Sequence, residues 1–147
     1  YFEAINFKLS PSDFGFHNAI QGENGDLTFI DFEYFGWDDP VKAVSDILLH
    51  PGNDLPKDLC ETFLRNVVPY FKIQDPDFVN RLKLLYPLFA CIWCLIILNE
   101  YLPERWARRI MVRGDDNRQA VQKSQLIKAQ RLLSSIESTH NIDLYLP

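Results

Sequence analysis

Three polar residues near the start of the chain have the types and the spacing to carry out chemistry together. Asp13 and Asn18 lie five positions apart in a segment rich in Ser, Gly and Phe, which predicts a loop. Asp31 follows thirteen positions after Asn18, directly behind the apolar residue Ile30. A carboxylate and an amide oxygen are ligands that Mg²⁺ accepts, and a second carboxylate that binds no metal can take up a proton. The trio therefore predicts a metal-dependent site that carries its own base.

Phosphoryl transfer is the reaction that such a trio would serve. A phosphoryl group in transit brings several negative charges, and Mg²⁺ held by hard oxygen ligands neutralises them. We expect Asn18 and Asp31 to be the metal ligands, and Asp13 to orient an acceptor hydroxyl and receive its proton. Glu33 would share a strand face with Asp31 and support the metal or the acceptor, although a solvated strand residue explains it equally well.

A short β-hairpin is expected to position these side chains. Asn24-Gly25 is a strong hairpin turn signal, and strand-forming residues follow it. We predict strands over residues 18–21 and 27–32, with the loop 10–17 leading into the first. The predicted metal ligands then lie at one end of the hairpin, beside the loop that carries the predicted base.

The rest of the chain is predicted to be helical. Asp39 is a good N-cap, and Pro40 is a good first residue of a helix. We expect about five helices, over residues 40–50, 56–72, 75–101, 103–113 and 117–138. The predicted fold class is therefore α+β and mostly α. Because no internal repeat or linker interrupts the sequence, residues 1–147 are expected to form one domain or one lobe of a domain.

Composition argues against some partners and compartments. The 147 residues are 47% hydrophobic and 24% charged, which is enough to build one core. Because 20 acidic residues outnumber 15 basic ones, the net charge of -5 supplies no basic field, and no nucleic acid partner is expected. Three cysteines, an odd number, and the lack of a leader-like segment favour a cytoplasmic protein over a disulfide scaffold.

One long apolar run, residues 85–98, raises two further possibilities. Cys91 and Cys94 form a C-x-x-C pair, but helical spacing puts them on one face of a predicted helix, so core packing is favoured over a zinc site. The run is shorter than the roughly 20 apolar residues that a membrane span needs, and it contains Pro87. We therefore expect a buried core helix and no membrane span.

The sequence around the three polar residues resembles the aminoglycoside phosphotransferase and choline kinase superfamily. The fold of that superfamily is similar to that of protein kinases. The resemblance lies in Ser10-Pro-Ser-Asp-Phe-Gly-Phe-His-Asn18, Phe29-Ile-Asp-Phe-Glu-Tyr34 and Asp38-Asp-Pro40. It implies that Asp13 is the catalytic Asp, that Asn18 binds metal and that Asp31 is the counterpart of the kinase D-F-G aspartate. Asp46 resembles the family's buried Asp that holds the catalytic loop. Pro11 and Gly15 stand where many relatives have His.

This resemblance implies a Mg²⁺-dependent kinase that transfers the γ-phosphoryl group of ATP to a hydroxyl of a small molecule. The acceptor would be a sugar, an amino alcohol or an aminoglycoside-like compound, and residues 31–34 are most similar to choline and ethanolamine kinases. The chain would be the C-terminal, catalytic-loop lobe, with the N-terminal nucleotide-binding lobe absent. We therefore expect these 147 residues to be inactive alone and to expose apolar surface near Phe2, Phe7, Phe14 and Phe16.

Other interpretations remain open from the sequence. The chain could be a non-catalytic pseudokinase or interaction module, and the same carboxylates could serve a metal-dependent phosphoester hydrolase. His17 is interpreted as a packed loop residue. An Arg cluster at helical spacing is a solvated face or an anionic-substrate patch; its members are Arg105, Arg108, Arg109 and Arg113. A set of aromatic residues could line a substrate pocket, although core packing explains most of them. The set is Tyr34, Phe35, Trp37, Trp93, Tyr101 and Trp106.

Overall fold

The fold was analysed in a computed structural model, which describes residues 7–114 and 117–137, without the side chains of Arg113 and Glu137. Within these residues, the chain is α+β and mostly helical, as predicted. Short strands come first: β1 (Lys8–Ser10), β2 (Ala19–Gln21), β3 (Leu27–Phe29) and β4 (Gly36–Asp38). Helices follow: α1 (Pro40–Leu49), α2 (Lys57–Lys72), α3 (Phe78–Ile97), α4 (Pro103–Arg113) and α5 (Arg118–Glu137).

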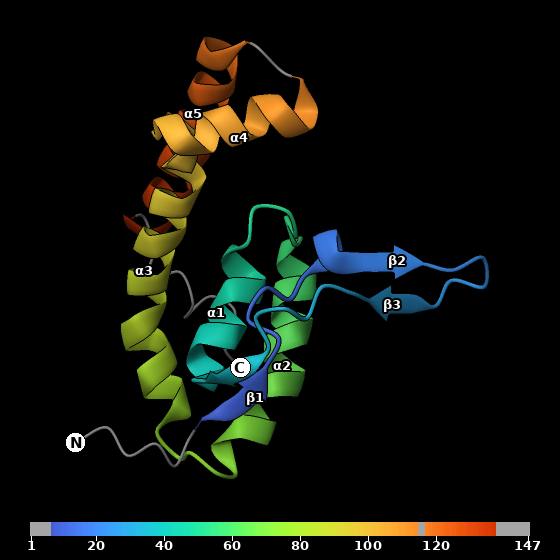
Figure 1. The fold of residues 1–147 in the computed structure, drawn as a ribbon. Coiled ribbons are helices and arrows are strands. Elements are labelled where there is room, and N and C mark those ends of the chain that lie inside the picture. The colour runs from blue at the N-terminus through green and yellow to red at the C-terminus, as the bar shows by residue number, and fades with distance from the viewer. Residues whose placement is uncertain (1–6, 115–116, 138–147) are drawn as a thin grey trace.

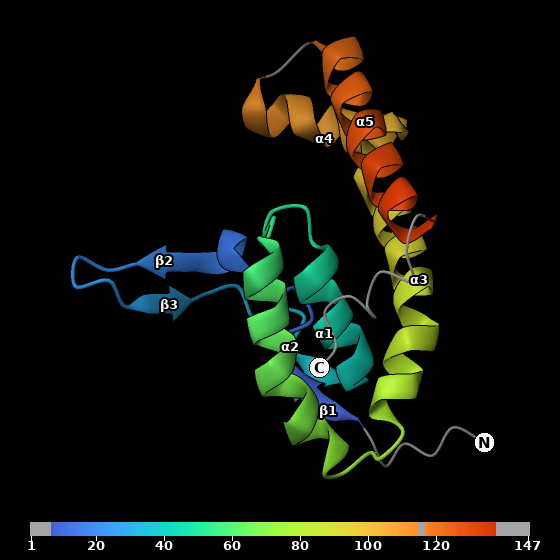
Figure 2. The same ribbon diagram turned by 180° about the vertical axis from the view of Figure 1, so that it is seen from behind.

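The strands form two separate antiparallel pairs. β1 pairs with β4, so that Lys8 lies opposite Asp38, and this pair sits against the helices. β2 pairs with β3, and the resulting hairpin extends away from the helical body (Figures 1 and 2). The turn between β2 and β3 contains Asn24 and Gly25 as predicted, and Gly25 has the positive φ of 87° that favours glycine.

The predicted hairpin strands are longer than the observed ones. Asn18 belongs to a short 3-10 helix, η2 (Phe16–Asn18), and not to the first strand. The second strand ends at Phe29, because the chain then bends toward β4, a strand that the sequence pattern did not predict. Asp31 takes up this bend with a φ of 63°, a conformation that Asp tolerates better than most residues. Glu33 lies in a turn, so the argument that Asp31 and Glu33 share a strand face was wrong.

The start of α1 is fixed by polar contacts that the sequence partly predicts. The Asp39 side chain caps the helix by accepting a hydrogen bond of 2.9 Å from the backbone N–H of Val41, as its position before Pro40 indicated. Arg81 of α3 bonds both to Asp39 and to Asp75, which lies in the turn before α3. Burial lowers the pKa of Arg81, but the two carboxylates outweigh it and raise the pKa overall. This pair of contacts ties the start of α1 to the start of α3.

The hydrophobic core lies between α1, α2 and α3. Helix α3 packs against α1 on one side and against α5 on the other (Figure 1). The core side chains come from these helices at the spacing of one helical face: Val41, Val44, Leu49, Leu64, Val68, Phe78, Leu82, Tyr86, Ala90 and Trp93. The helical part of the chain therefore builds its core without any side chain from the strands.

Only one face of α3 is buried, contrary to the prediction of a buried core helix. Leu84, Leu88 and Leu95 are 73%, 59% and 67% exposed. Cys91 is also exposed, so its assignment to the core was wrong, whereas Cys94 is half-buried. The segment Phe78–Tyr101 is long and apolar enough to cross a membrane by length and composition alone, a test that core helices of soluble proteins also pass. The expectation of no membrane span stays a prediction.

The helix boundaries agree with the sequence to within a few residues. The third predicted helix begins at Phe78 and not at Asp75, because Asp75 closes a turn by accepting the backbone N–H of Asp77. Its last residues form a 3-10 helix, η3 (Leu98–Tyr101). Ser138, the predicted end of the last helix, lies outside the described residues.

Candidate functional site

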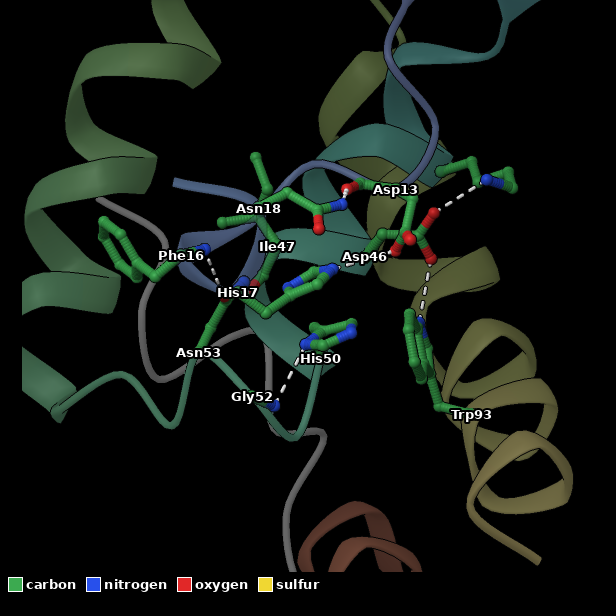
Figure 3. A network of polar contacts seen from close by, with 11 residues as sticks. Asp13, Phe16, His17, Asn18, Asp46, Ile47, His50, Gly52, Asn53 and Trp93 are labelled. Atoms are coloured by element: carbon green, nitrogen blue, oxygen red, sulfur yellow. Dashed lines mark hydrogen bonds and ion pairs between the residues drawn. The ribbon is translucent and has the colours of Figure 1, made fainter. Parts of the chain in front are cut away.

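Asp13 and Asn18 are joined within one compact loop. The Asn18 side-chain amide donates a hydrogen bond of 2.9 Å to the backbone carbonyl of Asp13, and the Asn18 backbone N–H donates one of 3.0 Å to Gly15 (Figure 3). Because the Asn18 nitrogen bonds the loop, its amide oxygen lies on the other branch of the side chain. That oxygen is the atom a metal would use, so the loop contact orients Asn18 for its predicted role.

Asp31 is brought beside Asn18 by the hairpin. The backbone N–H of Ile30 donates a hydrogen bond of 2.9 Å to the backbone carbonyl of Asn18, and Asp31 is the next residue. Asp31 is exposed, and so are its neighbours Ile30 and Phe32. The Asp31 carboxylate is therefore open to solvent, and its place beside Asn18 rests on the backbone hydrogen bond of Ile30.

The Tyr34 hydroxyl lies in the negative field of three carboxylates. Its pKa is raised mainly by a hydrogen bond and the negative charge of Glu33, with smaller contributions from partial desolvation and from the charges of Asp31 and Asp13. The hairpin bend and the loop therefore both add negative charge around Tyr34. Negative charge of this kind suits a hard cation.

Two histidines that the sequence analysis left out of the site lie against Asp13. The His17 ring nitrogen Nε2 is 3.2 Å from a carboxylate oxygen of Asp13, and the His17 ring stacks on His50 with centroids 4.1 Å apart and planes 7° apart (Figure 3). His50 follows the last residue of α1. Its pKa is lowered by burial and by His17, against the opposing charges of Asp13 and Asp46.

The Asp13, His17 and His50 ligand atoms all lie within 4.8 Å of one another, which raises the question of a transition-metal site. The geometry argues against it. His50 Nδ1 accepts a hydrogen bond of 3.0 Å from the backbone N–H of Gly52, so in neutral His50 the proton sits on Nε2. Nearly parallel stacked rings also keep their in-plane lone pairs in two separate, nearly parallel planes, which is unfavourable for binding one ion. We interpret the two rings as a support for Asp13.

Asp46 lies on α1 facing both the core and the loop. One carboxylate oxygen accepts a hydrogen bond of 2.9 Å from the Trp93 indole, and the other pairs with Lys42 at 2.7 Å. Burial lowers the pKa of Lys42, but Asp46 and Asp38 raise it by more. Asp46 also lines a cavity of about 190 Å³ together with loop residues 10–12. Its predicted role in holding the loop stays a prediction.

Asn53 ties the loop to the helical body. Its side-chain oxygen accepts a hydrogen bond of 3.0 Å from the backbone N–H of Phe16, and its side-chain nitrogen donates one of 3.0 Å to the carbonyl of Ile47 in α1. This approach needs a glycine at position 15, because a Cβ on Gly15 would lie 2.6 Å from the Asn53 oxygen and 2.8 Å from the His17 ring. Close packing against Asn53 and His17 therefore explains why position 15 is a glycine and not a larger residue.

A cavity of about 540 Å³ opens beside this site, between the loop after α1 and the helices α3, α4 and α5. His50 and Trp93 form part of its wall, and α4 contributes Arg105, Arg108 and Arg109. Helical spacing indicated the Arg cluster, but no sequence pattern placed it in a cavity. The side chain of Arg113 lies outside the described residues.

The predicted aromatic set does not form one cage. Trp93 lines the cavity and is 9% exposed, and Trp106 is buried, while Tyr34, Phe35 and Trp37 are exposed on the strand region. Core packing therefore accounts for only part of the set. Of the residues predicted to bare apolar surface, Phe7 is 45% and Phe16 51% exposed, Phe14 is half-buried against Phe29, and Phe2 lies outside the described residues.

No protein-family model matches the chain, and no curated protein or solved structure gives a significant match to it. The case for a function therefore rests on the residues and their geometry.

Proposed function

We propose that this chain is the catalytic-loop lobe of a Mg²⁺-dependent phosphotransferase of the aminoglycoside phosphotransferase type, which transfers the γ-phosphoryl group of ATP to a hydroxyl of a small molecule. The observation that carries the proposal is the junction of loop and hairpin. There, Asn18 bonds the Asp13 carbonyl with its side chain and the Ile30 amide with its backbone. Asp13 and Ile30, seventeen positions apart, are thereby both bonded to Asn18, which supports a shared site for Asp13, Asn18 and Asp31.

The donor set fits Mg²⁺. The Asn18 amide oxygen and the carboxylates of Asp31 and Glu33 are hard oxygen ligands, and both carboxylates are exposed to an incoming ion. The proposal is supported by the negative charges of Glu33, Asp31 and Asp13, which raise the pKa of Tyr34 and which an ion would neutralise. When bound, Mg²⁺ would supply charge neutralisation for the phosphate oxygens. Asn18 and Asp31 would hold it, with Glu33 in support.

Asp13 is the proposed base. The carboxylate of Asp13 is half-exposed at 42%, so an acceptor hydroxyl can reach it. His17 bonds one of its oxygens, which fixes the orientation of the carboxylate and leaves the other oxygen to accept the hydroxyl proton. The stack of His17 on His50 then fixes the orienting imidazole against the end of α1. Asp46, on α1 behind the loop, is the proposed structural support.

The proposal includes a second, nucleotide-binding lobe that packs on the strand region. Large apolar side chains there are exposed, among them Leu9 at 54%, Ile20 at 56% and Trp37 at 72%. Apolar surface of this extent is typical of a contact with another domain. A lobe on this side would cover the loop and exclude water from the phosphoryl group in transit.

The test is a coupled assay of ADP formation by the intact protein, with Mg²⁺, ATP and a panel of hydroxylated acceptors. We expect ADP formation that requires Mg²⁺ and rises with one acceptor class. Mg²⁺-ATP binding without turnover on the whole panel would favour a pseudokinase. Release of phosphate from a monoester in the absence of ATP would favour a hydrolase, and either result would contradict the proposal.

A further inference from the structure

The large cavity beside the site is positively charged although the chain as a whole is acidic. Four cationic side chains line it, namely Arg105, Arg108, Arg109 and Lys128, against one carboxylate, Glu100. Glu100 already bonds Arg109 at 2.8 Å. Within the described residues, Arg105, Arg108 and Lys128 have no carboxylate at ion-pair distance. Three charges of one sign therefore face the same space in a protein of net charge -5.

The arrangement of these charges comes from two helices. Arg105, Arg108 and Arg109 follow each other at i, i+3 and i+4, so α4 presents them on one face. Lys128 comes from α5, across the cavity from α4. The two helices are held in register by η3, since the Gln122 side chain donates a hydrogen bond of 3.2 Å to the Glu100 carbonyl and the Tyr101 hydroxyl donates one of 3.0 Å to the Gln122 carbonyl. The cationic lining is therefore set by packed elements.

The one carboxylate of the lining does not offset these charges. One oxygen of Glu100 bonds Arg109, while the other is buried and has no hydrogen-bond partner within the described residues. Glu100 therefore pairs with Arg109 and leaves Arg105, Arg108 and Lys128 to face the cavity.

The cavity adjoins the proposed base. His50 forms part of the cavity wall, and its ring stacks on His17, which bonds Asp13. The ligand atoms of Asp13 and His50 lie within 4.8 Å of each other. Asp13 does not itself line the cavity, but it lies directly behind the His50 part of the wall. A volume of about 540 Å³ is in the range of sites for small metabolites.

We propose that this cavity is the acceptor site and that it selects a hydroxylated small molecule bearing an anionic group, a phosphate or a carboxylate. The anion lies between Arg105, Arg108 and Lys128, and a hydroxyl is presented to Asp13. The inference rests on the proposed phosphotransferase function, because it names the acceptor of that reaction. An anionic acceptor differs from the choline-like and aminoglycoside-like acceptors that the motif resemblance implies, since both of those are cations.

The site can be tested without turnover, by NMR titration of the intact protein with inorganic phosphate, which probes the anion subsite alone. Trp93 lies in the cavity wall, so its indole N–H is a local reporter. We expect phosphate to shift this resonance and the amides of α4. The double variant Arg105→Gln/Arg108→Gln should weaken the binding at least about tenfold, because two charge-assisted hydrogen bonds are lost. Lys123→Gln/Arg131→Gln is the matched control, since it removes two exposed charges of α5 that do not line the cavity.

Three results would overturn the inference: no shift of Trp93 or α4 with phosphate, equal weakening in the control variant, or unchanged binding in the double variant. The ADP assay with matched pairs, such as glucose and glucose 6-phosphate or glucose and glucuronate, separates this inference from the proposed function. Turnover of neutral acceptors, insensitive to Arg105→Gln/Arg108→Gln, would overturn the anionic acceptor and keep the phosphotransferase. Phosphate binding in the cavity without any kinase activity would keep the anion subsite and overturn the phosphotransferase.

Discussion

The strand region, residues 7–38, and the helical region, residues 40–137, are stabilised in different ways. In the helical region, side chains from α1, α2 and α3 form a closed core with Phe78, Leu64 and Leu82 fully buried. In the described strand region, only Ser10 and Gly15 are buried, and the β2–β3 hairpin extends into solvent (Figure 2). Among the described residues, the proposed catalytic residues therefore lie on the part of the chain with the least apolar burial.

A few polar and ring contacts connect the two regions. They include the hydrogen bonds of Asn53 to Phe16 and Ile47, and the stack of His17 on His50. Each such contact is worth about 1 kcal/mol, whereas a buried core side chain is worth several times more. Because of this difference, the site can unfold locally while the helical body stays folded. Substitutions in the two regions are therefore expected to change stability by different amounts.

The largest effect is expected in the helical core. Phe78→Ala should lower the free energy of unfolding by about 3 to 5 kcal/mol, because the fully buried ring leaves a cavity behind. Denaturant unfolding followed by circular dichroism measures the change. Ile73→Ala is the control, since Ile73 is 81% exposed and its loss should cost less than about 0.5 kcal/mol. Equal losses would contradict the placement of the core.

A smaller effect is expected where the two regions meet. Asn53→Ala should cost about 1 to 2 kcal/mol, since it leaves the Phe16 N–H and the Ile47 carbonyl without this partner. Hydrogen exchange at the Phe16 amide should accelerate while exchange in α3 does not change. Asn66→Ala removes a side-chain contact within α2 and is the control. Uniform acceleration throughout the protein would show that the regions unfold as one unit.

The smallest effect concerns pH. Because the pKa of His50 is lowered in the folded state, the unfolded state binds its proton more readily. This residue therefore contributes stability that is present above its unfolded pKa of about 6.5 and is lost as the pH falls below it. His50→Gln should make the stability decline less steeply between pH 7 and pH 5. Identical slopes for the variant and the native protein would contradict the half-buried His50 with a lowered pKa.

The helices could be predicted because their signals are local and repeated. The cap at Asp39 and the apolar spacing within α3 and α5 fix the type of each element over many residues. The strands could not be predicted well, since each described strand has three residues and little burial to impose alternation. β4 pairs with β1 across 25 intervening residues, and no local pattern encodes such a pairing.

The candidate site also contains residues that the sequence could predict and residues that it could not. Asp13, Asn18 and Asp31 could be chosen from their types and spacing, and hydrogen bonds join Asn18 to Asp13 and to Ile30, the residue before Asp31. Their joint role in a site stays a prediction. His50 could not be chosen, because its contact with His17 depends on how α1 packs beside the loop. The only sequence signal for His17 was its position directly before Asn18. That position does not show whether the ring packs within the loop or orients Asp13.

The most direct test of the account is Asp13→Asn in the intact protein, because the amide keeps the shape of the side chain but cannot take up a proton. Phosphoryl transfer should fall about 10²- to 10⁴-fold while Mg²⁺-ATP binding, measured by calorimetry, stays within about twofold of the native value. Asp26→Asn, in the exposed hairpin turn, is the matched control and should leave both unchanged. Undiminished transfer by Asp13→Asn would contradict the assignment of the base and, with it, the proposed function.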